Sequence, residues 1–191
     1  MRVIAGSHRG RRLSGPRGTA LRPTSDKVRE ALFSILGTQV SGGRFLDLYA
    51  GTGAVGIEAL SRGASIVTFV ESDPKAVQLL QQNLQACQFL ERAQVRVGKT
   101  ATFLDRNDWW GGPYDVLFAD PPYADLDALS TLIHAWRPGL LSERAAMIIE
   151  QDSRTKLPTS IDHATLVRKY LYGDTALYLY GVSTTCESTG S

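Results

Sequence analysis

The sequence is poor in cysteine and contains no long hydrophobic run. Its two cysteines, Cys87 and Cys186, lie far apart and match no metal-binding or redox spacing. Isolated thiols are typical of a reducing compartment, so we expect a cytoplasmic protein with no disulfide framework and no bound metal. No stretch approaches the roughly eighteen apolar residues that a membrane-spanning helix needs, so we expect no contact with a membrane.

The first residues also lack the features of a secretory signal. "MRVIAGSHRGRRL" is basic but has neither a continuous apolar stretch nor a small-residue cleavage site. Histidine is scarce as well. His8, His134 and His163 form no ligand spacing and join no nucleophile pattern, so His134 and His163 are expected to be surface or packing residues.

The formal net charge is only +2, but its distribution is uneven. Residues 1–30 contain eight arginines and lysines against two acids, with glycines between them. This pattern favours an arm that binds a polyanion, and the alternative is a solvated tail. The candidate residues for such binding are Arg9, Arg11, Arg12, Arg17 and Arg22.

Residues 1–40 are predicted to form a small extension before the main domain. Strand-like pieces on either side of "SHRG" predict a hairpin. "RPTSDKVREALFSILG" predicts a helix with Thr24 or Ser25 as its cap and Gly37 at its end.

From residue 44 strands and helices alternate. Strands are expected at 44–50, 64–72, 93–97, 114–120 and 145–151, with helices or short helical segments between them. This order implies a parallel sheet covered on both faces. Two further strands, 164–172 and 175–182, are joined through "GD" and predict a hairpin. We therefore expect an α/β doubly wound, mostly parallel sheet over residues 41–182 that ends in an antiparallel hairpin, followed by a disordered tail, 183–191.

A glycine-rich loop follows the first of these strands. Gly51, Gly53 and Gly56 match G-x-G-x-x-G between a strand and a helix, where glycines allow a ligand to approach backbone N–H groups. Glu71 ends the next strand, where an acid typically holds the hydroxyls of a ribose. The pattern predicts a nucleotide-type cofactor rather than a merely tight turn.

Asp47 separates two cofactors that share this pattern. A dinucleotide places its pyrophosphate at the helix N-terminus, where an extra carboxylate would repel it. Asp47 precedes the glycines and is better placed to meet an amino group, such as that of S-adenosyl-L-methionine (SAM). "GKT" at 98–100 resembles a phosphate loop, but position 93 is alanine and "QVRV" is predicted to be a strand.

The segment "FADPPYAD" has two interpretations. A proline pair is a good strand terminator, so the segment can be only a turn. Alternatively, the rigid turn holds Asp120, the Pro121 carbonyl and Tyr123 at the ligand-binding edge of the sheet. Such a group suits a planar base: Asp120 and Pro121 accept from its exocyclic amine, and Tyr123 stacks on its ring.

Five segments together resemble a known family: "RPTSDKVREALF", "DLYAGTGAVGIEALSRGA", "VESD", "DPPY" and "YGDTALYLY". The chain is similar to the RsmD-type 16S rRNA guanine-N2 methyltransferases of bacteria from about Arg2 to Gly181. The resemblance implies a class I SAM-dependent methyltransferase fold. It also implies SAM as the cofactor and small-subunit rRNA as the substrate, in an assembled particle.

Carried over by position, the resemblance implies roles for individual residues. Asp47, Gly51 and Gly53 would line the methionine side of SAM and Glu71 the ribose. Ser72 and Thr100 would border the adenine, and the turn residues listed above would hold the guanine. Such enzymes often have an acidic or amide side chain at the adenine, where this chain has Lys99 and Thr100.

Three other functions remain to be distinguished. A DNA adenine-N6 methyltransferase can use the same turn, but it usually has a separate target-recognition domain. An NAD-dependent oxidoreductase leaves Asp47 and the rigid turn unexplained, and a non-catalytic RNA-binding assembly factor would not need Asp120. Glu150 is predicted to end the fifth parallel strand at the functional edge, as a substrate contact or as a structural carboxylate. We expect a monomer.

Overall fold

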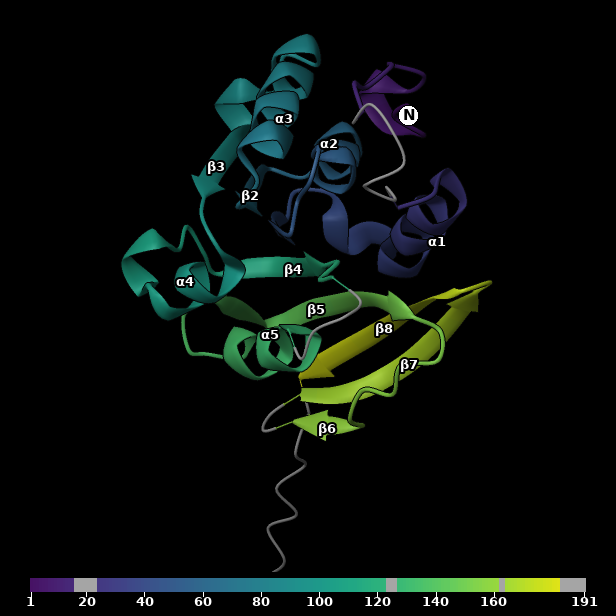
Figure 1. Ribbon diagram of the computed structural model, residues 1–191, viewed down its shortest axis with the longest axis vertical. Helices are drawn as coiled ribbons and strands as arrows, with labels where there is room; N and C mark the ends of the chain where they lie inside the picture. The colour runs from purple at the N-terminus through teal and green to yellow at the C-terminus, as the bar shows by residue number, and fades with distance from the viewer. Residues whose placement is uncertain (16–23, 123–126, 162–163, 183–191) are drawn as a thin grey trace, which may run out of the picture.

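The computed structural model describes residues 1–15, 24–122, 127–161 and 164–182 (Figure 1). Within them, eight strands form one sheet in the order β3-β2-β1-β4-β5-β8-β7-β6. The five strands from β3 to β5 in this order pair in parallel, and β8, β7 and β6 continue the sheet in antiparallel pairs. The strands are β1 (Arg44–Leu48), β2 (Ile66–Glu71), β3 (Ala93–Val97), β4 (Tyr114–Ala119), β5 (Leu141–Asp152), β6 (Ser160–Ile161), β7 (Ala164–Tyr172) and β8 (Thr175–Val182).

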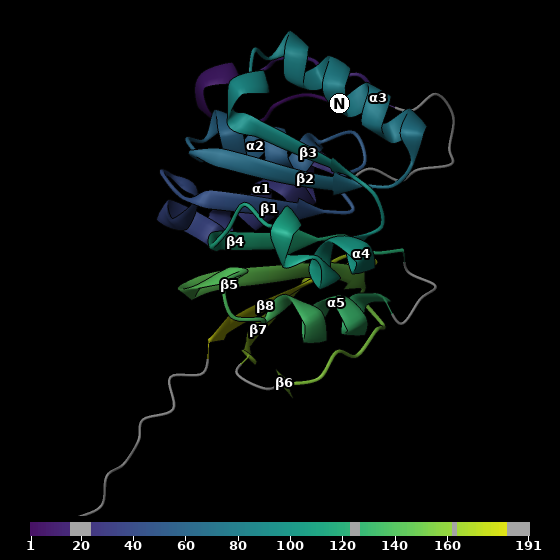
Figure 2. The same ribbon diagram turned by 90° about the vertical axis from the view of Figure 1, so that its left-hand side faces the viewer.

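Helices cover both faces of the sheet. Figure 2 shows α4 and α5 in front of the strands and α1 and α2 behind them. The helices are α1 (Asp26–Leu36), α2 (Ala54–Ser61), α3 (Pro74–Ala86), α4 (Thr100–Asp105) and α5 (Asp127–Ala135). This arrangement confirms the predicted doubly wound fold with a terminal antiparallel hairpin.

The predicted helix boundaries follow from local chemistry. The Ser25 hydroxyl accepts a hydrogen bond from Val28 N and so caps α1, while Gly37, at φ 55°, ends it. The α3 helix begins with Asp73 as its cap and Pro74 in its first turn, where a missing N–H costs nothing. None of the described helices is long and apolar enough to cross a membrane.

Alternation along the strands decides which side chains face which layer. In β1, Phe45 packs in the core beneath α1 and α2, whereas Leu46 and Leu48 pack beneath α4 and α5. The same alternation places Asp47 on the α1 side, since it lies between Leu46 and Leu48. In β4, Val116 and Phe118 also face α1, which directs the next alternate residue, Asp120, to that side.

Two strands differ from the prediction. The β5 strand begins at Leu141 and continues to Asp152, so Glu150 lies inside it, paired with Leu177 of β8. The short strand β6 was not predicted, because two residues carry no periodic pattern. The predicted N-terminal hairpin is present: Arg2 and Arg12 form an antiparallel bridge, and backbone hydrogen bonds on either side of it join the two arms. The predicted tail, 183–191, lies outside the described residues.

Candidate methyl-transfer site

The predicted site residues meet at one edge of the sheet. Because β1, β2, β3 and β4 run parallel, their carboxyl ends lie together, and the loops after them form a single rim. Gly51 and Gly53 follow β1, Glu71 ends β2, Thr100 follows β3 and Asp120 follows β4. The sequence therefore predicted the common location of these residues correctly.

The glycine loop is needed for both conformation and packing. Gly53 is the N-cap of α2 at φ 81°, and a Cβ there would lie 2.2 Å from Leu80 Cδ1. A Cβ at Gly56 would lie 2.2 Å from Phe69 Cε1, so this glycine lets α2 approach the sheet. The loop is thereby held close against β2 and α3.

Asp47 lies beneath this loop. Its side chain is 2% exposed, and its carboxylate accepts a hydrogen bond from Gly56 N at 2.8 Å. Burial raises the pKa of Asp47 to about 7, with the Glu71 carboxylate adding to the effect and the Gly56 hydrogen bond opposing it. A positive charge beside this buried carboxylate would favour its ionised form.

Glu71 organises the start of two loops. Its Oε1 accepts from Ser72 N at 2.7 Å and Asp73 N at 2.8 Å, and its Oε2 accepts from Gly51 N at 2.7 Å. A carboxylate offers about four acceptor positions, so these contacts leave one on Oε2. The side chain thus fixes the glycine loop relative to β2 and retains a position for a hydroxyl donor.

A cavity of about 360 Å³ opens beside Glu71, which lies within the size range of small-molecule sites. Ser72, Lys99 and Thr100 line it from the loops after β2 and β3, and Thr100 is 5% exposed. Val70 and Leu104 supply apolar wall. The cavity therefore combines a carboxylate, hydroxyls and apolar surface, as an adenosine requires.

Sequence reasoning missed the part of the wall that comes from α5 and from the residue after β1. Tyr49 lines the cavity in a left-handed conformation, φ 60°, which is unusual for a bulky residue. Its hydroxyl lies 3.0 Å from Thr131 Oγ1 of α5. His134, expected at the surface or in packing, also lines the cavity, and Ser130 O lies 2.7 Å from its Nδ1. The one available signal was the position of Tyr49, two residues before Gly51.

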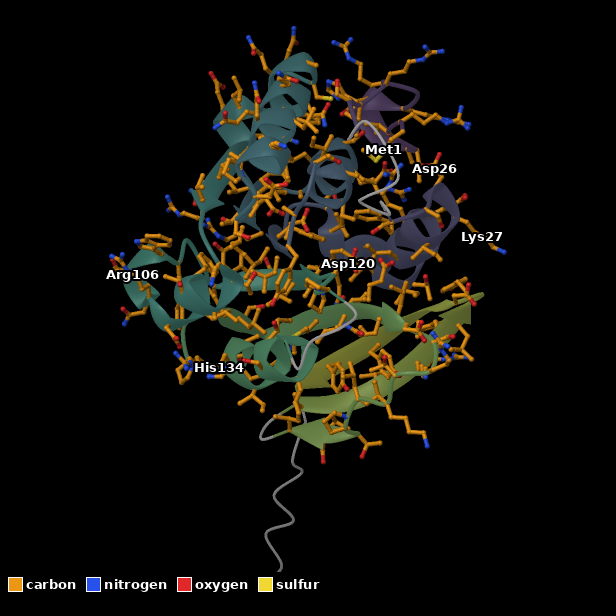
Figure 3. The ribbon with its side chains drawn as sticks, viewed as in Figure 1. Met1, Asp26, Lys27, Arg106, Asp120 and His134 are labelled. Atoms are coloured by element: carbon orange, nitrogen blue, oxygen red, sulfur yellow. The ribbon has the colours of Figure 1, made fainter. Side chains whose placement is uncertain are left out.

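The Asp120 turn lies at the end of β4, as Figure 3 shows. Burial raises the pKa of Asp120 well above its ordinary value, and the Glu150 and Asp47 carboxylates raise it further. Pro121 is buried, and Pro122 lines the cavity, so the turn borders the cavity. Tyr123, the predicted stacking residue, lies outside the described residues.

Residues 1–15 do not form the free arm or the solvated tail that the sequence suggested. The fully buried Glu58 of α2 accepts from Ile4 N at 2.7 Å and Ala5 N at 2.9 Å, and also from Arg62 Nε. Asn83 of α3 accepts from Ser14 N at 2.7 Å and donates to Thr52 O in the glycine loop. The segment is packed against α2 and α3 because these buried groups satisfy its backbone.

Docking of the segment leaves its basic side chains on the surface. Arg9, Arg11 and Arg12 are exposed, although Arg11 also donates to Ala86 O. Arg2 and Arg9 line a second hollow of about 330 Å³ between this segment and the start of α1. Arg17 and Arg22 lie outside the described residues.

Comparison with known proteins identifies the family. The family described as "Conserved hypothetical protein 95" matches residues 1–181. The chain belongs to this family, the RsmD-type methyltransferases. The chain is 40% identical to "Putative rRNA methyltransferase YlbH" of Bacillus subtilis over 94% of its own length and 98% of the relative. It is 35% identical to "Ribosomal RNA small subunit methyltransferase D" of Escherichia coli K12, over 94% of this chain and 89% of that one.

The fold agrees with that of solved RsmD-type relatives. "Putative methyltransferase yhhF from Escherichia coli" superimposes with a TM-score of 0.84 at 35% identity, covering 95% of this chain and 97% of that chain. The fold is therefore that of a class I methyltransferase.

Proposed function

We propose that this protein transfers a methyl group from SAM to the exocyclic N2 amine of a guanine in bacterial 16S rRNA, on an assembled small-subunit particle. The observation that carries the proposal is the position of Asp120. It follows β4 in a proline-fixed turn beside the cavity of about 360 Å³, and burial raises its pKa. The names of the two relatives as rRNA methyltransferases support the substrate class.

The rim residues fit SAM. Glu71 has an acceptor position left on Oε2 for a ribose hydroxyl, and Ser72 and Thr100 line the cavity at the adenine side. Asp47, a buried acid under the glycine loop, matches an ammonium group. SAM supplies an electrophilic methyl group on a sulfonium sulfur. A separate acidic or amide partner for the adenine is not required if backbone groups after β3 meet its amino group.

Asp120 is the group that acts on the target amine. Its carboxylate and the Pro121 carbonyl accept from the two amine hydrogens, which directs the nitrogen lone pair toward the methyl group. As the nitrogen–carbon bond would form, the sulfur–methyl bond of the sulfonium would break and leave a neutral thioether, and the nitrogen would have to lose one proton. A carboxylate with a raised pKa accepts that proton more readily than an ordinary one. Tyr123 stacks on the guanine, which leaves its duplex to reach the turn.

The basic N-terminal segment supplies the RNA contact. Because Glu58 and Asn83 hold residues 1–15 against α2 and α3, the exposed arginines form a fixed surface. A fixed surface loses less conformational entropy on binding than a free arm, which suits recognition of a folded particle. RNA-binding residues in this proposal are Arg9, Arg11, Arg12, Arg17 and Arg22. The substrate places the reaction in the cytoplasm.

Mass-spectrometric mapping of ribosomal RNA tests the proposal. Cells with and without the gene are compared, and purified protein is then supplied with SAM and either naked 16S rRNA or small subunits. We expect one N2-methylguanine to be lost without the gene and restored on particles. Methylation of adenine in DNA, or of no nucleic acid, would contradict the proposal.

A further inference from the structure

Glu150 and Asp120 are neighbours on adjacent strands. β4 and β5 pair in parallel with Ala119 beside Ile149. The residues that follow them, Asp120 and Glu150, are therefore neighbours. Adjacent strands lie about 4.8 Å apart. Since Phe118 and Ile148 both pack toward α1, the two acids extend from the sheet on that same side. Two carboxylates therefore lie side by side.

A third group reaches this pair from the N-terminal part of the chain. Thr24 Oγ1, directly before the cap of α1, donates to Glu150 Oε2 at 3.1 Å. Glu150 is 3% exposed and Thr24 is half-buried, so this contact closes over the carboxylate from the edge of the protein interior. It joins residues that are 126 positions apart in the sequence.

We propose that Glu150 is a positioning residue, held by Thr24 at the start of α1, that sets the position and charge state of Asp120. The inference rests on the proposed function, since it concerns the same methyl-transfer site. The Thr24 hydroxyl holds the Glu150 carboxylate in place beside Asp120, so the loss of this contact displaces a charged neighbour of the turn.

The charges around the turn agree with this role. The acids that act on Asp120 are Glu150 from β5 and Asp47 from β1, and both raise its pKa. From α1, Asp26 and Lys27 are exposed, and the buried Arg29 contacts Arg2 O and Asp26. Among the described residues, Glu150 is thus the largest electrostatic influence on Asp120 after burial itself.

Two variants separate the charge of Glu150 from its link to Thr24. Glu150→Gln keeps an oxygen acceptor for the Thr24 hydroxyl but removes the charge. We expect the Asp120 titration midpoint to fall, because a neighbouring negative charge is removed. The midpoint is followed by carbon-13 NMR of labelled aspartate carboxyls and assigned with Asp120→Asn. The midpoint of the acid limb in a plot of methyl-transfer rate against pH should move to lower pH in the same way. An unchanged Asp120 midpoint in folded Glu150→Gln would overturn the electrostatic part.

Thr24→Val removes the hydroxyl and keeps the shape of the side chain. We expect kcat on small subunits to fall about tenfold, because a small displacement of the reacting groups is costly, with SAM affinity unchanged. Thr24→Ser restores the hydroxyl and should restore kcat. Thr38→Val, the same change at an exposed threonine beyond the far end of α1, is the matched control and should have no effect. Equal kcat for Thr24→Val and wild type would overturn the link.

These measurements also distinguish this inference from the function on which it rests. The NMR titration needs neither RNA nor SAM. A wild-type protein that methylates no RNA, with a normal Glu150 effect on Asp120, refutes the proposed function alone. An active enzyme refutes this inference alone if its Asp120 midpoint is unchanged by Glu150→Gln and its kcat is unchanged by Thr24→Val.

Discussion

Acidification below pH 7 is expected to weaken SAM binding through Asp47. Its pKa is raised from 3.8 to about 7 by burial. An ammonium group beside the carboxylate favours the ionised form, so binding below pH 7 must release a proton. A return from about 7 to the ordinary value corresponds to roughly 4 kcal/mol at most, at about 1.4 kcal/mol for each pKa unit. The affinity should therefore fall by about tenfold for each pH unit below 7 and stay constant above it.

The assay is calorimetry with SAM at several pH values between 5 and 8, in buffers of different ionisation enthalpy that report the proton released. Asp47→Asn cannot ionise, so its affinity should be weaker at pH 8 and nearly independent of pH. Asp105→Asn removes a more exposed acid from the cavity wall and is the matched control, which should keep the wild-type slope. A flat wild-type profile, or an Asp47→Asn profile with the wild-type slope, would refute the role of Asp47.

Three further changes test other parts of the site. Glu71→Ala should weaken SAM binding by about 1–3 kcal/mol by calorimetry, because a charge-assisted hydrogen-bond partner is lost; unchanged affinity would remove Glu71 from the site. Glu58→Gln should lower the free energy of unfolding in urea by about 3–5 kcal/mol, since the buried carboxylate pairs with Arg62, and a loss below 1 kcal/mol would contradict the anchoring role. Changing Arg9, Arg11 and Arg12 together to alanine should flatten the log–log salt dependence of RNA affinity by about two to three units and leave SAM binding intact. Identical slopes for the two proteins would place RNA recognition elsewhere.

The sequence was informative wherever a residue type has a local reason to be at its position. Alternating strands and helices predicted the parallel sheet, and Ser25 and Gly37 marked the ends of α1 through capping. Since strand order and direction bring the carboxyl ends together, the shared location of the glycine loop, Glu71 and Asp120 also followed from the sequence.

The remainder depends on contacts between distant segments. No local pattern indicates that Glu58 accepts from Ile4 N, so the sequence left an arm and a solvated tail as the two alternatives and did not predict a docked surface. The contact of Tyr49 with Thr131 and the place of His134 in the cavity depend on how α5 packs. The sequence pattern placed Glu150 at a strand end, whereas β5 continues beyond it because β5 pairs with β8.

The most direct test of the account is the effect of Asp120→Ala on turnover and on SAM affinity, measured with purified protein and small ribosomal subunits. If Asp120 acts on the target amine in the transition state, kcat should fall by roughly 10²–10³, as for the loss of one preorganised polar contact. The dissociation constant of SAM should stay within a few-fold of wild type. An equal loss of SAM affinity and turnover would make Asp120 a cofactor ligand, and unchanged turnover would contradict the proposed chemistry.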